Sequence, residues 1–209
     1  MHITVWNDYI CPWAYAARPQ TAWLRDRIAA TEAERGNPGD EPITISVRSF
    51  ELHPDLPSEG TTVRPGGRLD KVFDHIAGEC EKRALPFVKP TRTPNSHRIL
   101  ALAELVDHRH PETFLAFDDA VARAYWVEGR AIDDDAELAA MLERLDLDRS
   151  LLDDVEGIGE QRLAAARTAA MAVGATATPT WQINDLVVTG LHDDAQFHRW
   201  VGRILERSS

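Results

Sequence analysis

The sequence predicts an α/β fold in which an all-helical subdomain is inserted into a domain that contains both strands and helices. Three stretches indicate this: a strand–helix–strand pattern at the start, a long and almost wholly helical middle, and a strand–strand–helix pattern at the end. We expect the first domain to comprise residues 1–67 and 173–209, and the inserted helical subdomain to comprise residues 68–172. With 209 residues, 44% of them hydrophobic, the chain can bury one substantial core.

The opening residues predict a strand, a long helix and a second strand. Residues 2–6 alternate between polar and apolar side chains, and residues 12–34 carry apolar side chains at roughly helical spacing. Pro19 lies within this helix and should kink it, because proline removes one backbone hydrogen bond and its ring clashes with the preceding turn. A turn cluster at 36–40 separates the helix from the second alternating strand, at 43–47.

The middle of the chain predicts five helices that are separated by proline and glycine. Their expected ranges are 69–84, 96–108, 112–127, 135–145 and 159–172. Beyond them, residues 180–184 and 186–189 predict a hairpin that turns near Asn184 and Asp185. Asp193 can cap the N-terminus of a last helix, because its side chain can accept a hydrogen bond from a free backbone N–H group.

Charge and composition limit the expected partners. The formal net charge of −11 argues against nucleic acid or an anionic membrane surface, because both are bound through clustered Lys and Arg. No apolar run is long enough to cross a membrane, and no secretory signal pattern precedes the first strand. We therefore expect a cytoplasmic protein that has no membrane partner. Arg greatly outnumbers Lys among the basic residues, which favours GC-rich coding DNA and a bacterial source.

The two cysteines need separate explanations, because two thiols cannot form a disulfide framework. Cys11 lies between a predicted strand and the start of a helix, where unpaired N–H groups and the helix dipole stabilise a thiolate and lower its pKa. Pro12 suits the first helical position. A buried structural thiol is the alternative interpretation of Cys11. Cys80 lies among charges of both signs, which favours a bystander thiol, although a role as a distant resolving cysteine stays open.

Other motifs do not indicate a metal or a nucleotide. The pair His108 and His110 has no partner at a spacing typical of zinc sites. Residues 157–159, Gly-Ile-Gly, lack the preceding strand and the third glycine of a nucleotide-binding loop. The acidic run at 133–135 is most simply a solvated helical face. We expect no metal site and no tightly bound cofactor.

Residues 11–14, Cys-Pro-Trp-Ala, have the outline of a Cys-x-x-Cys redox motif with alanine in place of the second cysteine. With its surroundings, Asp8–Tyr15, this motif resembles the start of the active site in the DsbA family, in particular its FrnE-like branch, whose typical members carry Cys-Pro-Trp-Cys. A second segment, 174–181, is similar to the part of that family that holds a cis-proline. Weaker matches fill the middle of the chain, at 50–54, 94–98 and 125–130.

This resemblance implies a thioredoxin-like fold in the DsbA arrangement, with a cis bond between Thr178 and Pro179. It implies that Cys11 is the catalytic nucleophile and that Thr178 offers backbone groups to an extended substrate. The residues that would bind substrate are Pro12, Trp13, Ala14, Asn95, Thr178 and Pro179. Asn95 is included because the insertion overhangs the thiol site in related proteins, although capping of a helix by Asn95 or Ser96 is the simpler explanation of these residues.

Ala14 departs from the family's pattern, and this departure indicates an activity that does not depend on a second cysteine. Because Ala14 cannot resolve a mixed disulfide, we expect a monothiol thiol-disulfide oxidoreductase acting on a small-molecule or protein disulfide, with glutathione or mycothiol as the resolving co-substrate. A homodimer is compatible with this expectation. The sequence also looks like the kappa-type glutathione transferases and 2-hydroxychromene-2-carboxylate isomerases, in which one residue at the position of Cys11, usually serine, activates a bound thiol. A third hypothesis is a non-catalytic binding module on the same fold.

Overall fold

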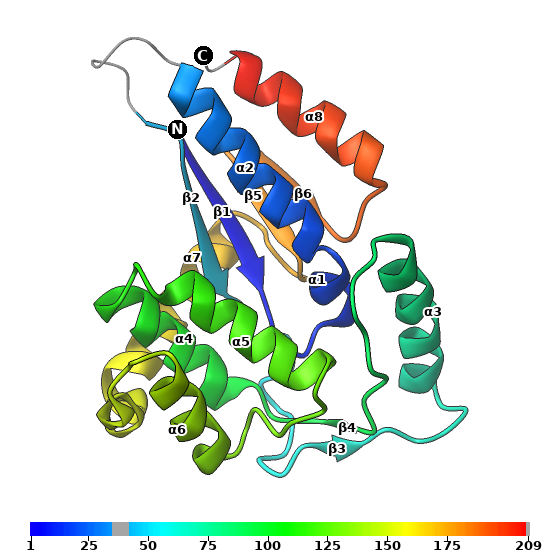
Figure 1. The fold of residues 1–209 in the computed structure, drawn as a ribbon, viewed down its shortest axis with the longest axis vertical. Coiled ribbons are helices and arrows are strands. Elements are labelled where there is room, and N and C mark those ends of the chain that lie inside the picture. The colour runs from blue at the N-terminus through cyan, green and yellow to red at the C-terminus, as the bar shows by residue number, and fades with distance from the viewer. Residues whose placement is uncertain (35–41, 208–209) are drawn as a thin grey trace.

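A four-stranded mixed sheet forms the centre of the computed structural model, which describes residues 1–34 and 42–207 (Figure 1). The strands are β1 (His2–Asn7), β2 (Thr44–Ser49), β5 (Thr180–Ile183) and β6 (Leu186–Thr189), in the spatial order β2-β1-β5-β6. β1 pairs in parallel with β2 and antiparallel with β5, so Val5 lies between Val47 and Trp181. The predicted turn cluster at 36–40 lies outside the described residues.

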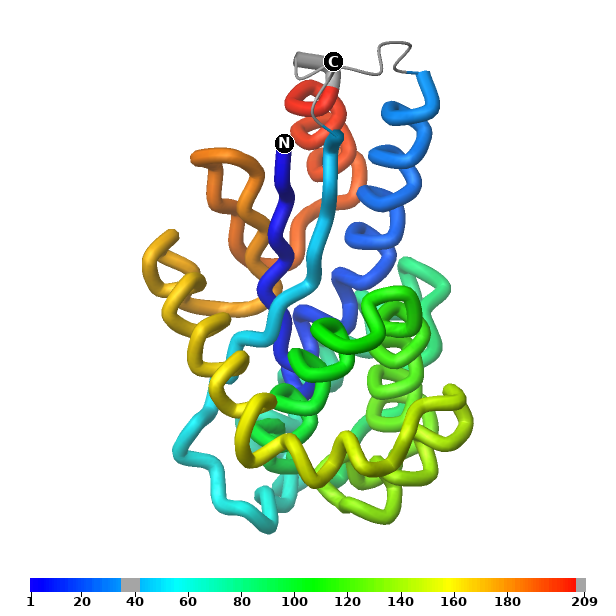
Figure 2. Tube along the Cα trace, turned by 90° about the vertical axis from the view of Figure 1, so that its left-hand side faces the viewer, coloured from blue at the N-terminus to red at the C-terminus, as the bar shows by residue number. Residues whose placement is uncertain are grey.

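Alternation along β1 divides the sheet into two buried faces, because successive side chains of a strand point in opposite directions. Ile3 and Val5 pack in one cluster with side chains of α2 (Arg18–Glu34) and α8 (Asp194–Arg207). Trp6 packs on the opposite face, in a cluster that includes Ala166 of α7 (Glu160–Ala172). Figure 2 shows the same arrangement, with α2 and α8 on one side of the strands and α7 on the other.

The helical middle of the chain forms the second part of the core. The helices are α3 (Arg68–Lys82), α4 (His97–Arg109), α5 (Phe114–Trp126), α6 (Asp135–Arg144) and α7, and each agrees with its predicted range to within two residues at either end. α4 is the central helix, since every residue from Ile99 to Val106 is buried. A helix that is apolar on all sides needs neighbours all round. The division of the chain at 67/68 and 172/173 stays a prediction.

Two local features were not predicted. β3 (Thr61–Thr62) and β4 (Arg92–Thr93) form a short antiparallel ribbon, whose two-residue strands are too short to carry an alternating pattern. Before α7, a 3₁₀ segment (Arg149–Asp154) runs into one π-helical turn (Val155–Gly159). A Cβ on Gly159 would lie 3.0 Å from the backbone oxygen of Ala101, so glycine permits this turn to pack closely against α4.

The prediction of one kinked helix over residues 12–34 is wrong. The chain instead forms a five-residue helix, α1 (Pro12–Ala16), and then α2 from Arg18 onward, with the break at Ala17. Pro19 therefore lies in the first turn of a new helix, where a missing N–H group removes no helical hydrogen bond. The consequence for the site is that α1 is a separate short helix between the strand β1 and the long helix α2.

The predicted features of the C-terminal segment are confirmed. β5 and β6 form the hairpin, and Asn184 in its turn has a φ of 53°, a left-handed conformation that asparagine tolerates better than most residues. Asp193 caps α8, since its side chain accepts a hydrogen bond of 2.9 Å from the backbone N–H of Gln196.

Candidate functional site

Cys11 is the residue at which two distant segments of the chain meet. It is the N-cap of α1, its side chain is buried with 4% exposure, and Pro12 is the first helical residue. The thiol donates a hydrogen bond to the carbonyl oxygen of Thr178, with 3.2 Å between Sγ and the oxygen. The Thr178–Pro179 peptide bond is cis, the isomer that the resemblance implies. The structure thus brings together Cys11 and Thr178, which the sequence separates by 167 positions.

A buried carboxylate, Asp8, orders the turn that leads into Cys11. Asp8 accepts hydrogen bonds from the backbone N–H groups of Ile10, at 3.2 Å, and Leu52, at 2.9 Å. Its own carbonyl oxygen accepts the N–H of Cys11 at 3.0 Å. Burial raises the pKa of Asp8 to about 6, although these N–H groups act in the opposite direction. Sequence reasoning gave Asp8 no role, and the signal that could have found it is an acidic residue directly after an apolar strand.

The predicted lowering of the pKa of Cys11 is wrong. Burial raises the pKa of the thiol above its ordinary value, while its contact with Thr178 and the N–H groups of Ala14 and Trp13 lower it only in part. The charge of Asp8 raises it further. The position at a helix start was read correctly from the sequence, but the removal of the sulfur from water outweighs the effect of a five-residue helix. The neutral thiol is therefore favoured in this arrangement.

Cys11 lines a cavity of about 490 Å³, which we call the thiol cleft. Its walls come from the start of α1, from α3, from the segment after β2 and from the β3–β4 ribbon. The apolar side chains among its lining residues are Ile10, Pro12, Trp13, Leu52, Leu56, Leu69, Val72 and Phe73. Trp13 extends this surface, since its ring lies 5.3 Å from the ring of His75. A substrate that brings a disulfide to Cys11 in this cleft would meet mainly apolar walls.

Asn95 supports a wall of the thiol cleft and is not among its lining residues. Its Nδ2 donates a hydrogen bond of 2.7 Å to the carbonyl oxygen of Leu56, which does line the cleft. Its Oδ1 accepts the N–H of His97 at 2.9 Å and so also helps to start α4. The geometry favours the capping interpretation for Asn95, and a direct contact with substrate stays a prediction.

Cys80 lies in the core between α3 and the other helices. Its side chain has 0% exposure, and burial raises its pKa to about 11. A thiol that water does not reach and that stays protonated at neutral pH is a poor nucleophile. These observations support the interpretation of Cys80 as a bystander and give no support to a resolving role.

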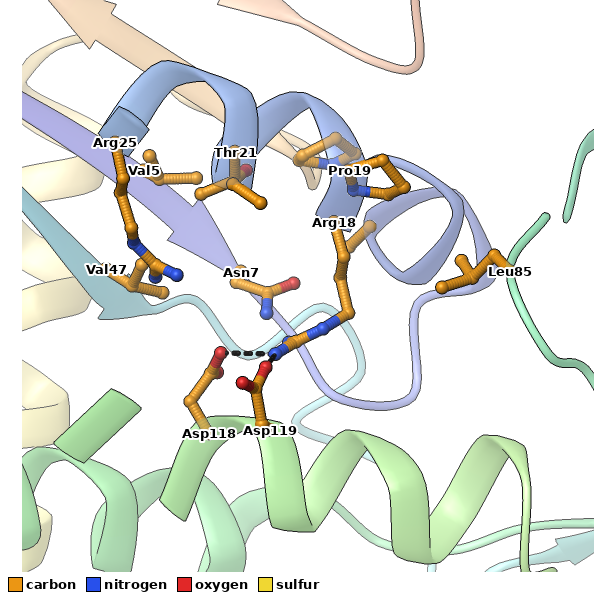
Figure 3. Close-up of a pocket in the computed structure, with 13 residues that line it drawn as sticks. Val5, Asn7, Arg18, Pro19, Thr21, Arg25, Val47, Leu85, Asp118 and Asp119 are labelled. Carbon is orange, nitrogen blue, oxygen red and sulfur yellow. Dashed lines mark hydrogen bonds and ion pairs between the residues drawn. The ribbon is translucent and has the colours of Figure 1, made fainter. Parts of the chain in front are cut away.

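A second cavity, of about 290 Å³, lies beside the other end of the same motif (Figure 3), and we call it the rear cavity. Ala14 and Pro179 form part of its lining, together with residues of β1, β2, α2 and α5. Its polar lining residues are Asn7, Arg18, Thr21, Arg25, Asp118 and Asp119. α1 therefore separates two different spaces, with Trp13 facing the thiol cleft and Ala14 facing the rear cavity.

The charges of the rear cavity are only partly paired. Nη2 of Arg18 contacts Oδ2 of Asp118 at 2.7 Å and also contacts Asp119. Burial alone would lower the pKa of Arg18, but the charges of Asp118 and Asp119 outweigh it and raise that pKa. Arg25 has no ion pair or hydrogen bond from its guanidinium to the side chains described in residues 1–34 and 42–205. Sequence reasoning missed this cavity, although the arginines seven positions apart on one helix were a signal for it.

Comparison with known proteins gives one family match. Residues 2–201 match the family described as DSBA-like thioredoxin domain. A search of curated proteins found no match.

Solved structures with the same fold include three that bear on the site. A "probable DsbA oxidoreductase" from Streptomyces coelicolor is 19% identical, with a TM-score of 0.80 over 99% of this chain and 90% of that chain. A 2-hydroxychromene-2-carboxylate isomerase is 18% identical, with a TM-score of 0.73 over 99% of this chain and 97% of that chain. The cytosolic disulfide reductase DsbM from Pseudomonas aeruginosa, solved with glutathione, is 16% identical, with a TM-score of 0.63 over 99% and 100%.

Two further kinds of site were sought in the described part of the chain. No three His, Cys, Asp or Glu side chains there come together in a way that could hold a metal ion. None of the helices described there has the length and apolar character needed to cross a membrane.

Proposed function

The chain belongs to the family of proteins with a DSBA-like thioredoxin domain, and from this premise we propose that it is a FrnE-like thiol-disulfide oxidoreductase with one reacting cysteine. The observation that carries the proposal is the setting of Cys11. Its sulfur lies at the junction of α1 and Thr178, in a cavity large enough for a substrate, while the position of the second cysteine holds Ala14. The other thiol, Cys80, is fully buried elsewhere.

The proposed reaction consists of three exchanges. The Cys11 thiolate attacks one sulfur of a disulfide, so that a bond forms to Sγ and the other substrate sulfur leaves as a thiolate. A small thiol, glutathione or mycothiol, then attacks Sγ and releases the rest of the substrate as a second thiolate. A second molecule of the small thiol frees Cys11 and leaves as the oxidised disulfide. The substrate disulfide is reduced and two small thiols are oxidised, so electrons balance.

Neighbouring groups have defined parts in this reaction. The carbonyl oxygen of Thr178 holds the thiol hydrogen in the resting protein, and backbone groups at Thr178 would align an extended substrate. Trp13, Pro12 and the apolar walls of the thiol cleft would exclude water from the exchanging sulfurs. The raised pKa of Cys11 has two consequences: less thiolate is present at neutral pH, but each thiolate is more nucleophilic, because nucleophilicity increases with pKa.

The expected substrate is a small-molecule or protein disulfide, and the expected setting is the cytoplasm, where small thiols are abundant. The glutathione present with DsbM supports a small thiol as the co-substrate. We include a homodimer in the proposal, with no nucleic acid and no membrane as partner.

The proposal is tested by turnover of a small neutral disulfide in the presence of glutathione or mycothiol. Cys11→Ser should reduce the rate to that of the uncatalysed reaction, because an alcohol does not form the mixed disulfide. Cys80→Ala is the matched control and should keep the wild-type rate, since Cys80 is buried away from the cleft. Equal rates for wild type and Cys11→Ser would overturn the proposal.

A transferase or isomerase of the kappa and 2-hydroxychromene-2-carboxylate type is the second candidate. Structural similarity to the isomerase over nearly the whole of both chains favours it, and one reacting residue is sufficient for such chemistry. In this case the protein would activate a bound thiol for addition to an electrophile. Thiol-dependent turnover of an electrophile by Cys11→Ser would distinguish this candidate from the oxidoreductase. If Cys11→Ala leaves ligand binding unchanged and no turnover is found, the remaining hypothesis is a binding module.

A further inference from the structure

We propose that the rear cavity binds the resolving thiol, and that Arg25 selects a thiol that carries a carboxylate. This inference rests on the proposed function, because it needs a mixed disulfide on Cys11. It assigns a binding site to a cavity on the opposite side of α1 from the thiol cleft.

Arg25 brings a positive charge to the rear cavity. Figure 3 shows the Arg18 and Arg25 side chains extending from α2 toward α5, where Arg18 meets Asp118 and Asp119. Arg25 lines the same cavity and has no anionic partner of its own in the part of the chain that the structure describes. Burial lowers the pKa of Arg25, and although the nearby charge of Asp118 acts against this, the charge of Arg18 adds to the lowering. A cation in this setting is stabilised by an anion that arrives with a ligand.

The rear cavity suits a small ligand in its size and in its access to water. The volume of about 290 Å³ lies at the lower end of the range for small-molecule sites and suits a ligand the size of a small mercapto acid. One wall is open to water, since the side chain of Asp119 is 73% exposed, whereas that of Asp118 is 4% exposed. Asp119 is paired with Arg18, whereas Oδ1 of the buried Asp118 has no hydrogen-bond partner in the described residues. Of the two arginines only Arg25 lacks an ion pair there, so a ligand carboxylate would bind at Arg25, and Oδ1 of Asp118 is left to accept from a donor group of the same ligand.

Ala14 connects the rear cavity with the Cys-Pro-Trp-Ala motif. This residue lines the rear cavity three positions after Cys11, and those two positions carry the pair of sulfurs in a Cys-x-x-Cys motif. Pro179, which also lines the cavity, directly follows the residue that contacts Sγ of Cys11. Cys11 itself does not line the rear cavity and the Ala14 side chain is buried, so a thiol seated on Arg25 reaches Sγ only past the Ala14 methyl group. A bond would form between the sulfur of this thiol and Sγ while the bond from Sγ to the substrate breaks, and the substrate would leave as a thiolate.

The test measures resolution of a defined mixed disulfide in full-length Cys80→Ala protein. Cys11 first reacts with neutral 4,4′-dithiodipyridine, which forms a mixed disulfide between Sγ and one pyridylthio group and releases the other as pyridinethione, and the adduct is checked by mass. Release of pyridinethione is then followed by stopped flow after addition of 3-mercaptopropionate or of neutral 2-mercaptoethanol. To correct for the intrinsic reactivity of each thiol, its rate is divided by the rate at which the same thiol reacts with a pyridyl disulfide free in solution. We expect the corrected rate for mercaptopropionate to saturate and to exceed that for mercaptoethanol by about tenfold, which corresponds to one charge-assisted hydrogen bond.

Variants of α2 separate the charge of Arg25 from general effects. Arg25→Gln should reduce the ratio of the two corrected rates to about one, and Arg25→Lys should retain most of it. Arg27→Gln removes a charge from the same helix at a position that does not line the cavity, and should leave the ratio unchanged. Thermal melting of each variant checks that it is folded.

The outcomes distinguish the two proposals. If the adduct forms but the ratio is near one in the wild type, or is equal in wild type and Arg25→Gln, the rear cavity does not bind the resolving thiol, and the proposed function stands. If no adduct forms on Cys11, the proposed function fails and this inference fails with it.

Discussion

The thiol cleft and the rear cavity lie on two sides of one five-residue helix and differ in chemistry. The thiol cleft is the larger, about 490 Å³, and most of its lining side chains are apolar. The rear cavity is about 290 Å³ and is lined by two arginines and two aspartates. Each contains one end of the Cys-Pro-Trp-Ala motif, with Cys11 in the first and Ala14 in the second. In the reaction that we propose, these two cavities have different tasks: the thiol cleft receives the disulfide and the rear cavity receives the small thiol.

The division depends on the break between α1 and α2. A continuous helix through Ala17 would place α1 in line with α2, whereas the separate α1 is held by side chains from the helical part of the molecule. Tyr15 donates a hydrogen bond to the carbonyl oxygen of Pro86, and its ring stacks on that of Trp126 with 5.2 Å between centroids. Nε1 of Trp126 donates to the carbonyl oxygen of Tyr9 at 2.8 Å. These contacts fix α1 as the wall between the two cavities.

Ala14→Cys is the substitution expected to alter the difference between the two cavities most. It places a second sulfur at the wall of the rear cavity, three residues after Cys11, so resolution becomes intramolecular and no longer depends on an external thiol. We expect the single-turnover rate of substrate release to become independent of glutathione concentration, and the oxidised variant to contain a disulfide between Cys11 and the introduced cysteine. Peptide mapping and rates at several glutathione concentrations provide the measurement. A rate that still rises in proportion to glutathione would show that the cysteine introduced at position 14 does not attack the mixed disulfide on Cys11.

Asp8→Asn tests how a buried carboxylate near the thiol cleft affects the stability of the protein. Because burial raises the pKa of Asp8 from 3.8 to about 6, the folded protein binds a proton more tightly than the unfolded chain, and stability should fall as pH rises from about 4 to about 6. The shift corresponds to about 2–3 kcal/mol of unfolding free energy. Urea unfolding across this window should show the decline in wild type and its loss in Asp8→Asn. The readout is the slope of the unfolding free energy against pH and not its absolute value, because asparagine also alters the hydrogen bonds to Ile10 and Leu52.

The same variant should change the reactivity of Cys11. The ionised Asp8 raises the pKa of the thiol, so Asp8→Asn should shift the pH profile of Cys11 alkylation to lower pH. Asp74→Asn, which removes an exposed carboxylate of α3, is the control and should leave the profile in place. An unchanged profile in Asp8→Asn would contradict the electrostatic coupling of Asp8 to the site.

The smallest expected effect is a difference in unfolding free energy between two tryptophan variants. One tryptophan supports α1, and the other lies in the core of the sheet. Trp126→Phe removes the hydrogen bond to Tyr9 and leaves a buried carbonyl oxygen unpaired, whereas Nε1 of Trp181 has no partner in the described residues. Both side chains are almost fully buried, so both substitutions remove similar packing. We expect Trp126→Phe to cost about 1–2 kcal/mol more than Trp181→Phe, by urea unfolding. Equal losses would show that the hydrogen bond does not stabilise the fold.

Most of the fold could be predicted because its elements carry strong local patterns. The alternation in β1 and the helical spacing in α3, α5, α6 and α7 are consequences of burial on fixed faces, whereas α4 is an apolar run that is buried on all sides. The β3–β4 ribbon could not be predicted, because two residues per strand leave no periodicity. The break at Ala17 was missed for a different reason: a proline in a helical pattern is compatible with a kink or with the first turn of a new helix.

The sequence predicted where in the chain the site lies, but not how deeply the sulfur is buried or which side chains surround it. The motif around Cys11 and the segment around Thr178 indicated which residues would meet, and they do. Burial of the sulfur depends on side chains from α3 and from the loop after β2, which no local pattern connects with Cys11. The rear cavity was missed because arginines and aspartates on helices are typical of solvated faces. Asp118 was the informative exception, since it lies within the apolar pattern of α5 and is buried.

The measurement that tests the central claim most directly is the intact mass of the protein after exposure to oxidised glutathione, with peptide mapping of the product. If one buried thiol carries the chemistry, the wild type should gain a single glutathione on Cys11, and the adduct should disappear on addition of a reduced thiol. Cys80→Ala should behave in the same way, because Cys80 has 0% exposure. An adduct on Cys80, or no adduct on Cys11 at any pH up to the range in which the thiol ionises, would contradict the claim.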